Sequence, residues 1–214
     1  FDSWGQPTIW WQLLKDQLGF TVNAPYTLDD MSADAVGLLD VVGYQDAHVI
    51  GFSMGGMLAQ QISAQYPQRV RSLTSVMSTT FAKHLPPPTK AANDALTNLA
   101  SGDTTEERTQ AIRDRGFYPE SMPRQLMAIF KTGDRSAEVK TIAVKTLVIH
   151  GEDDGLIPPS HGEHTAELID NSEIVIFPGM GHNIPEDILP NMLERIISHM
   201  KTADYVAANI ESHH

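Results

Sequence analysis

The stretch that decides the fold is HVIGFSMGGMLA, residues His48–Ala59. Its apolar start predicts a strand, Gly51–Gly55 matches the pattern G-x-S-x-G, and Met57–Tyr66 favours a helix that stops at a proline. Strand, sharp turn and helix are the setting in which Ser53 stands clear of the backbone as a nucleophile. Side chains two residues before and after this serine would collide in so tight a turn, so we expect glycine to be required at positions 51 and 55.

An ordinary serine in a glycine-rich turn gives the same string, so the motif needs support from elsewhere in the chain. Thr146–His150 (TLVIH) and Glu173–Phe177 (EIVIF) predict two further strands, followed by GEDDG and by PGMGH, which ends at His182. Three strands then deliver a serine, a carboxylate and a histidine to one sheet edge, where open α/β sheets bind ligands. A serine hydroxyl needs a neutral imidazole to take its proton, and that imidazole needs an acceptor for its other nitrogen.

The periodicity of the rest of the chain predicts an α/β fold. The other expected elements are helices at Ile9–Leu18, Thr27–Val42 and Met192–Met200 and a strand at Arg71–Met77. Thr27 and Asp30 form a capping-box-like pair at the start of the second of these helices. Parallel strands joined by helices imply right-handed crossovers.

Residues 79–140 interrupt this alternation of strands and helices. The segment begins near three consecutive prolines and shows helical patterns near Lys90–Ala100, Thr104–Ile112 and Glu120–Phe130, without a good strand. We expect a helical cap or lid over the site, and the alternative is a helical subdomain that only packs. The predicted organisation is therefore a first part of the core at 1–78, a cap at 79–140 and a second part of the core at 141–214.

The composition narrows the class of protein. A hydrophobic content of 41% and a net charge of −12 fit a globular chain and argue against nucleic acid or an anionic membrane as partner. The chain has no cysteine, which excludes disulfides and thiolate chemistry and fits a cytoplasmic location, although a signal before Phe1 stays open. No apolar run is long enough to span a membrane.

One of the nine histidines stands in a motif of its own. His182 is preferred over the other eight because it alone follows a strand in a Gly-x-Gly-His turn. His150 lies on an expected strand, and we expect a structural role for it. His161 and His164 share an expected helix at His161–Ile169, but no acidic or cysteine partners accompany them, so we predict no metal site and no cofactor.

With these motifs the chain resembles the α/β-hydrolase superfamily over nearly all of Thr27–Met200. GFSMGGMLAQ, HGEDDGLIP and PGMGHNIP match its nucleophile, acid and histidine motifs, in the family's order. PYTLDDMSADAVGLLD and RSLTSVMSTT resemble bacterial serine esterases of the aclacinomycin methylesterase-like group. The resemblance implies that Asp154 is the acid beside Ser53 and His182, with Asp153 as the alternative and Glu152 solvated.

The resemblance implies a serine carboxylesterase that forms an acyl-enzyme on a small-molecule ester, with the backbone N–H of Met54 in the oxyanion hole. Thioesterase, lactonase, C–C hydrolase, perhydrolase and acyltransferase activities would use the same three residues. A hydrolase-fold binding protein with a silent triad is the alternative outside enzymes.

The chain departs from the family at its start and in the cap. The family's first strands and its HG-type loop, which supplies a second oxyanion N–H, precede the position that matches Phe1, and the cap is short near Ile112. We therefore expect that part of the sheet is missing and that the sequence is incomplete. A chain of only this length would have weak activity, or none without a complementing N-terminal segment. The sequence also leaves open that the chain forms a homo-oligomer.

Overall fold

The computed structural model describes residues 11–12, 14–15, 18–101, 105–114, 116, 118 and 121–211. The short helix expected at Ile9–Leu18 lies largely outside these residues, and the terminal His213 and His214 lie wholly outside them. The contacts divide the chain into two compact units. One unit comprises Phe1–Asp30 with Thr89–Gly133, and the other comprises Met31–Pro88 with Asp134–His214.

The larger unit is built on a parallel sheet of four strands in the order β1-β2-β3-β4, so each strand pairs with its neighbours in sequence. The strands are β1 (Ala47–Phe52), β2 (Val70–Val76), β3 (Thr146–Gly151) and β4 (Ser172–Phe177). In register, Phe52 lies opposite Val76, and Gly151 lies opposite Phe177. The carboxyl ends of the strands therefore meet at one edge of the sheet, as the motifs predict.

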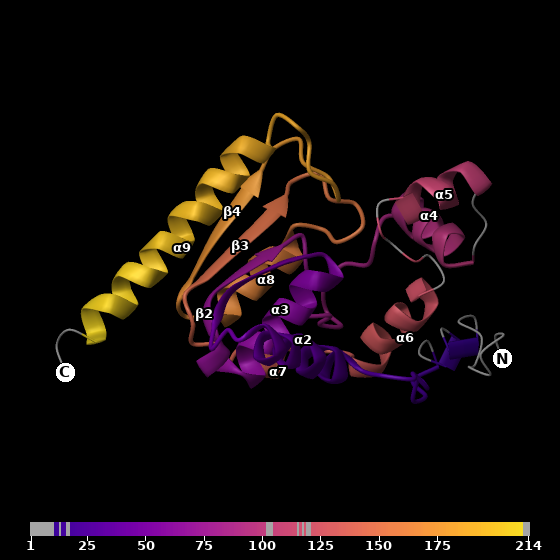
Figure 1. The fold of residues 1–214 in the computed structure, drawn as a ribbon. Coiled ribbons are helices and arrows are strands. Elements are labelled where there is room, and N and C mark those ends of the chain that lie inside the picture. Colours follow the sequence, from indigo (N-terminus) through magenta and orange to yellow (C-terminus); the bar gives the residue numbers. More distant parts are fainter. Residues whose placement is uncertain are drawn as a thin grey trace. The chain divides into compact units, whose positions relative to one another are not determined.

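Helices cover both faces of this sheet (Figure 1). They are α2 (Leu28–Val42), α3 (Met54–Gln65), α7 (Ser136–Val139), α8 (Ser160–Leu168) and α9 (Leu189–Glu211), with a short 3-10 turn at Pro67–Arg69. Figure 1 shows α9 on one side and α3 and α8 on the other, as right-handed crossovers require for helices that join parallel strands.

Each face has its own apolar core. Met192 and Ile196 of α9 pack against Leu147 and Ile149 of β3. On the α3 side, the buried residues are Ala59, Leu73, Val139, Ile142 and Ile169. Because β3 is buried along its whole length, the TLVIH run reads as a continuous apolar segment rather than an alternating one.

The smaller unit contains α4 (Lys90–Ser101), α5 (Glu106–Asp114) and α6 (Met122–Thr132), and no strand among its described residues. These helices agree within a few residues with the three that the sequence predicts. The predicted cap also takes in residues 79–88 and 134–140, which group with the sheet by contacts. A cap function for this segment stays a prediction.

Two further elements differ from expectation. The last helix, expected at Met192–Met200, is longer because apolar positions such as Ala203 continue to be buried beyond it. Helix α7 was not expected, since its four residues are too few for a periodic pattern.

The capping pair at the start of α2 is confirmed: Asp30 N donates to Thr27 Oγ1 at 3.3 Å, and Thr27 N donates to Asp30 Oδ2 at 2.8 Å. No helix in the described part is both long and apolar enough to cross a membrane.

Candidate active site

Ser53 lies in the turn between β1 and α3, with φ of 53° and ψ of −120°. A positive φ is strained for a residue with a side chain, so the surroundings must hold it. The N–H of Ser53 donates to the carbonyl of Val76 at 2.9 Å, and its carbonyl accepts from the N–H groups of Gly56 and Met57 at 2.9 and 3.2 Å. The sheet and the first turn of α3 therefore fix the serine in its strained conformation.

Glycine is required at position 51, as predicted, because a Cβ there would lie 2.0 Å from the carbonyl oxygen of Gly55. The prediction for Gly55 itself is wrong, since a Cβ on Gly55 would meet nothing within 4 Å. The second requirement falls on Gly56, where a Cβ would lie 2.6 Å from the Cβ of Ser78. A Cβ at position 55 would point away from neighbouring atoms, whereas a Cβ at position 56 would point at Ser78, in the loop that follows β2.

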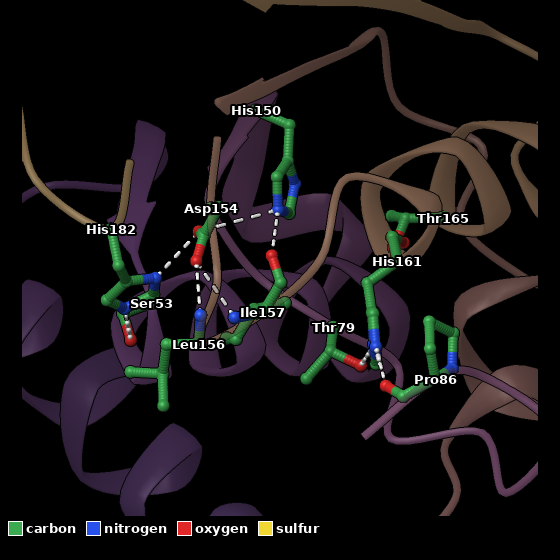
Figure 2. A network of polar contacts seen from close by, with 10 residues as sticks. All are labelled: Ser53, Thr79, Pro86, His150, Asp154, Leu156, Ile157, His161, Thr165 and His182. Atoms are coloured by element: carbon green, nitrogen blue, oxygen red, sulfur yellow. Dashed lines mark hydrogen bonds and ion pairs between the residues drawn. The ribbon is translucent and has the colours of Figure 1, made fainter. Parts of the chain in front are cut away.

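The structure brings Ser53, His182 and Asp154 together in one chain of hydrogen bonds (Figure 2). The Oγ of Ser53 lies 2.9 Å from Nε2 of His182, and Nδ1 of His182 lies 2.7 Å from Oδ2 of Asp154. Because a carboxylate only accepts, Nδ1 carries the ring proton and Nε2 is left to accept from the serine hydroxyl. Ser53 and His182 are partly exposed, so a reactant can reach the serine.

Asp154 is the buried end of this chain, with 3% of its surface exposed. Its Oδ1 accepts the backbone N–H groups of Leu156 and Ile157, each at 2.9 Å. Burial raises the pKa of this carboxyl, but the hydrogen bonds from His182, Ile157 and Leu156 outweigh burial and hold the pKa below its usual value. Asp153 and Glu152 are exposed, so Asp154 is the carboxylate that the structure brings to His182.

The loops that carry Asp154 and His182 are joined through their backbones. The N–H of Glu152 donates to the carbonyl of Phe177, and that of Asp153 donates to the carbonyl of Met180, both at 3.0 Å. A Cβ on Gly151 would lie 2.1 Å from the same Met180 carbonyl oxygen. Glycine at the end of β3 therefore lets the two loops touch, a requirement that sequence reasoning missed although the glycine begins the acid motif.

Met54 is the first residue of α3. N–H groups in the first turn of a helix have no partner within the helix and carry its positive dipole end. The backbone N–H that follows Ser53 is thus in the position where an oxyanion donor is expected.

Other histidines near the site bind backbone or hydroxyl groups. His150 donates from Nε2 to the carbonyl of Ile157 at 2.7 Å, and His161 lies 2.7 Å from Thr79 Oγ1 and 2.9 Å from the carbonyl of Pro86 (Figure 2). In the part of the chain that the structure describes, no group of three or more histidine, aspartate or glutamate side chains could hold a metal ion.

Arg135 is another residue that sequence reasoning missed. Its side chain is 1% exposed and donates to the carbonyls of Met57 and Thr79 and to Oε1 of Gln60. It therefore ties the residues that follow α6 in sequence to the helix behind Ser53. A lone arginine in an irregular segment carries no pattern that would have identified it.

The model of the α/β hydrolase fold family matches residues 4–115, just over half of the chain. The chain belongs to the α/β hydrolases. The matched residues include Ser53, whereas Asp154 and His182 lie beyond them.

Curated relatives of this α/β hydrolase have different reactions in their names. Rhodomycin D methylesterase DnrP of Streptomyces peucetius is 25% identical over 223 residues, which cover 84% of this chain and 75% of the relative. 2-Hydroxymuconate semialdehyde hydrolase of Pseudomonas putida is 28% identical over 196 residues, which cover 79% of this chain and 69% of the relative. An esterase of Exiguobacterium antarcticum has a similar structure, with a TM-score of 0.67 and 22% identity. The superposition covers 82% of this chain and 74% of the esterase, which supports the fold.

Proposed function

We propose that this α/β hydrolase is a serine carboxylesterase of small or medium esters, with Ser53 as nucleophile, His182 as base and Asp154 as the acid that orients the base. The observation that carries the proposal is the continuous chain of hydrogen bonds of 2.9 and 2.7 Å that joins these three side chains. The methylesterase among the relatives supports an ester as substrate.

In the first half of the reaction, Ser53 Oγ attacks the ester carbonyl carbon while its proton passes to Nε2 of His182. The imidazolium that forms is stabilised by Asp154, whose carboxylate is already held ionised by three hydrogen bonds. The tetrahedral oxyanion accepts a hydrogen bond from the N–H of Met54. His182 then gives its proton to the leaving alcohol, and the acyl group stays on Ser53.

In the second half, water repeats the attack on the acyl-enzyme. His182 takes the proton of the water, the second tetrahedral oxyanion collapses, and the carboxylic acid leaves as Ser53 regains its proton. The same side chains serve both halves, so the site needs no further acid or base.

Cleavage of a C–C bond is the second candidate reaction. The 28% identity to 2-hydroxymuconate semialdehyde hydrolase, a relative of comparable similarity to the methylesterase, favours it. Parallel kcat/KM measurements on an ester panel and on a vinylogous 1,5-diketone acid decide between the two. Greater turnover of the diketone would overturn the esterase proposal but would leave the proposed roles of Ser53 and His182 in place.

The experiment that tests the proposal is the intact mass of the protein before and after reaction with a fluorophosphonate. We expect one adduct, lost in Ser53→Ala and strongly reduced in His182→Ala, because the hydroxyl is a weak nucleophile without its base. Ser136→Ala is the matched control, since Ser136 Oγ also lies near a histidine, 3.3 Å from Nε2 of His164, but donates to Asp134 Oδ1.

The adduct should persist in the Ser136→Ala variant. An adduct that survives Ser53→Ala would show that another residue reacts, and the proposed nucleophile would be wrong. A wild-type protein that forms no adduct but binds small ligands would instead support the binding-protein alternative.

A further inference from the structure

His150 is a buried histidine that the proposed reaction does not use. Its side chain is 0% exposed and lies four residues before Asp154, at the end of β3. Its Nε2 is 2.7 Å from the carbonyl oxygen of Ile157, which can only accept, so Nε2 carries the ring proton. Figure 2 shows the ring beside Asp154, on the side away from Ser53.

The other ring nitrogen fixes His150 as neutral. Nδ1 is buried and has no hydrogen-bond partner among the described residues. A Cβ on Gly162 would lie 2.5 Å from it, so α8 packs directly against this nitrogen. A second proton on Nδ1 would be buried without an acceptor, which is costly. In agreement with this packing, burial lowers the pKa of His150 more than Ile157 and Asp154 raise it.

The N–H of His150 acts on the loop that holds the acid. Ile157 accepts from His150 through its carbonyl and donates through its N–H to Oδ1 of Asp154 at 2.9 Å. Nε2 of His150 also lies 3.6 Å from Oδ2 of Asp154, which is too far for a hydrogen bond but close enough for its N–H dipole to stabilise the anion. Oδ2 is the oxygen that accepts from His182.

We propose that His150 is a positioning residue, which holds the Asp154–Ile157 turn and sets the strength with which Asp154 polarises His182. This inference rests on the proposed function, since it assigns His150 a role in the same reaction. The titratable groups whose charges act on His150 are Asp154, His161 and His182, and of these only Asp154 is an acid. His150 therefore turns the positive end of its N–H dipole toward Asp154 without adding a net charge.

The test compares His150→Phe, which keeps a ring of similar size without an N–H, with His150→Gln, whose amide N–H reaches a similar position. We expect His150→Phe to lower kcat about 10- to 100-fold, the range seen when a hydrogen bond that orients a metal ligand is removed, because the Asp154–Ile157 turn is no longer held in place. KM should change little. The acid limb of the kcat/KM profile should move to higher pH, because an anion without the dipole stabilises the imidazolium of His182 more strongly. His150→Gln should restore most of kcat and the original profile.

His199 offers a matched control. It is also buried and also donates from Nε2 to a backbone carbonyl, that of Leu73 at 3.0 Å, but it lies on α9. His199→Phe should lower the melting temperature and leave the pH profile of kcat/KM unchanged. A loss of stability alone would therefore not imitate the effect of His150→Phe.

A second readout is independent of activity. Nitrogen-15 NMR of the imidazoles should find His150 as the neutral Nε2–H tautomer at every pH at which the enzyme is active. A protonated ring or the Nδ1–H tautomer would overturn the inference. So would a His150→Gln variant as impaired as His150→Phe, or a folded His150→Phe variant with the wild-type profile.

These outcomes separate the inference from the proposed function. If the wild-type protein reacts with the fluorophosphonate but the His150 variants keep its profile, only the role of His150 is wrong. If the wild-type protein does not react, the proposed function is wrong, and the role of His150 in that reaction is then also wrong.

Discussion

Nη1 of Arg135 donates a hydrogen bond of 3.0 Å to the carbonyl oxygen of Met57, in the first turn of the helix that follows Ser53. The guanidinium is buried and also binds Gln60 and the carbonyl of Thr79. Arg135 thus joins three points around the turn that holds the proposed nucleophile.

Arg135→Met should therefore destabilise the protein by about 1 to 3 kcal/mol, the cost of a buried acceptor that loses its donor. The midpoint of urea unfolding measures this change. Arg71 is the control, because its side chain is half exposed and pairs with Asp46 at the surface, where an ion pair contributes little. Equal shifts for Arg71→Met and Arg135→Met would contradict the prediction.

Asp154→Asn should lower kcat about 10,000-fold while leaving the fold intact. The new amide can donate to Nδ1 of His182, which would move the ring proton to Nε2 and leave no acceptor for the hydroxyl of Ser53. Steady-state kinetics on a chromogenic ester measures the loss. Asp153→Asn is the matched control because that side chain is exposed, and its activity should stay within a few-fold of wild type.

The stability of the protein should depend on pH through Asp154. Burial raises the pKa of this carboxyl, but hydrogen bonds to the ionised form lower it overall below its unfolded value of about 3.9. The stabilisation is therefore fully present above the unfolded pKa and is lost as the pH falls through the folded pKa.

Urea unfolding of wild type and Asp154→Asn between pH 7 and pH 3 tests this dependence. The difference in the free energy of unfolding should be constant from pH 7 to about pH 5 and should shrink below about pH 4. A difference that grows on acidification would mean that the pKa of Asp154 is raised.

The sequence predicted the parallel sheet and the meeting of Ser53, Asp154 and His182, because these features follow from short-range patterns. Each of the three residues follows the end of a strand, in a short motif that contains glycine, and Gly51 and Gly151 have a steric reason. Parallel register then brings the strand ends together without any knowledge of distant contacts. The choice of Asp154 over Asp153 came from the resemblance to the family, since both residues follow the same strand.

The features that the sequence did not predict depend on contacts between distant segments. Gly56 is needed because Ser78 approaches it, and Gly151 is needed because Met180 approaches it. The donation from Arg135 to Met57 spans 78 residues. Such contacts leave no periodic trace, so composition and spacing cannot reveal them.

Gly51→Ala and Gly55→Ala should have opposite outcomes although both change the G-x-S-x-G motif. A Cβ at 51 would lie 2.0 Å from a backbone oxygen, so the turn must deform, and we expect a loss of at least about 1 to 3 kcal/mol. A Cβ at 55 meets nothing within 4 Å, and alanine favours the helix, so stability should hold or rise. Thermal unfolding of the two variants compares them directly.

The N–H of Met54 should contribute to turnover as an oxyanion donor. Replacement of residue 54 by the α-hydroxy analogue of methionine turns this N–H into an ester oxygen and should lower kcat about 100- to 1000-fold, with a small effect on KM. The same replacement at Met122, the first residue of α6, is the control and should leave kcat unchanged. Equal kinetics for the two replacements would exclude Met54 from the oxyanion hole.

The hydrogen bond between Ser53 and His182 joins residues that lie 129 positions apart. During translation at about 5 to 20 residues per second, the histidine therefore follows the serine from the ribosome after a delay on the order of ten seconds. A serine hydroxyl without its base is a weak nucleophile. Under the proposed function, the growing chain would carry an inert serine until β4 and the loop after it have been made, which would avoid premature acylation of the nascent protein.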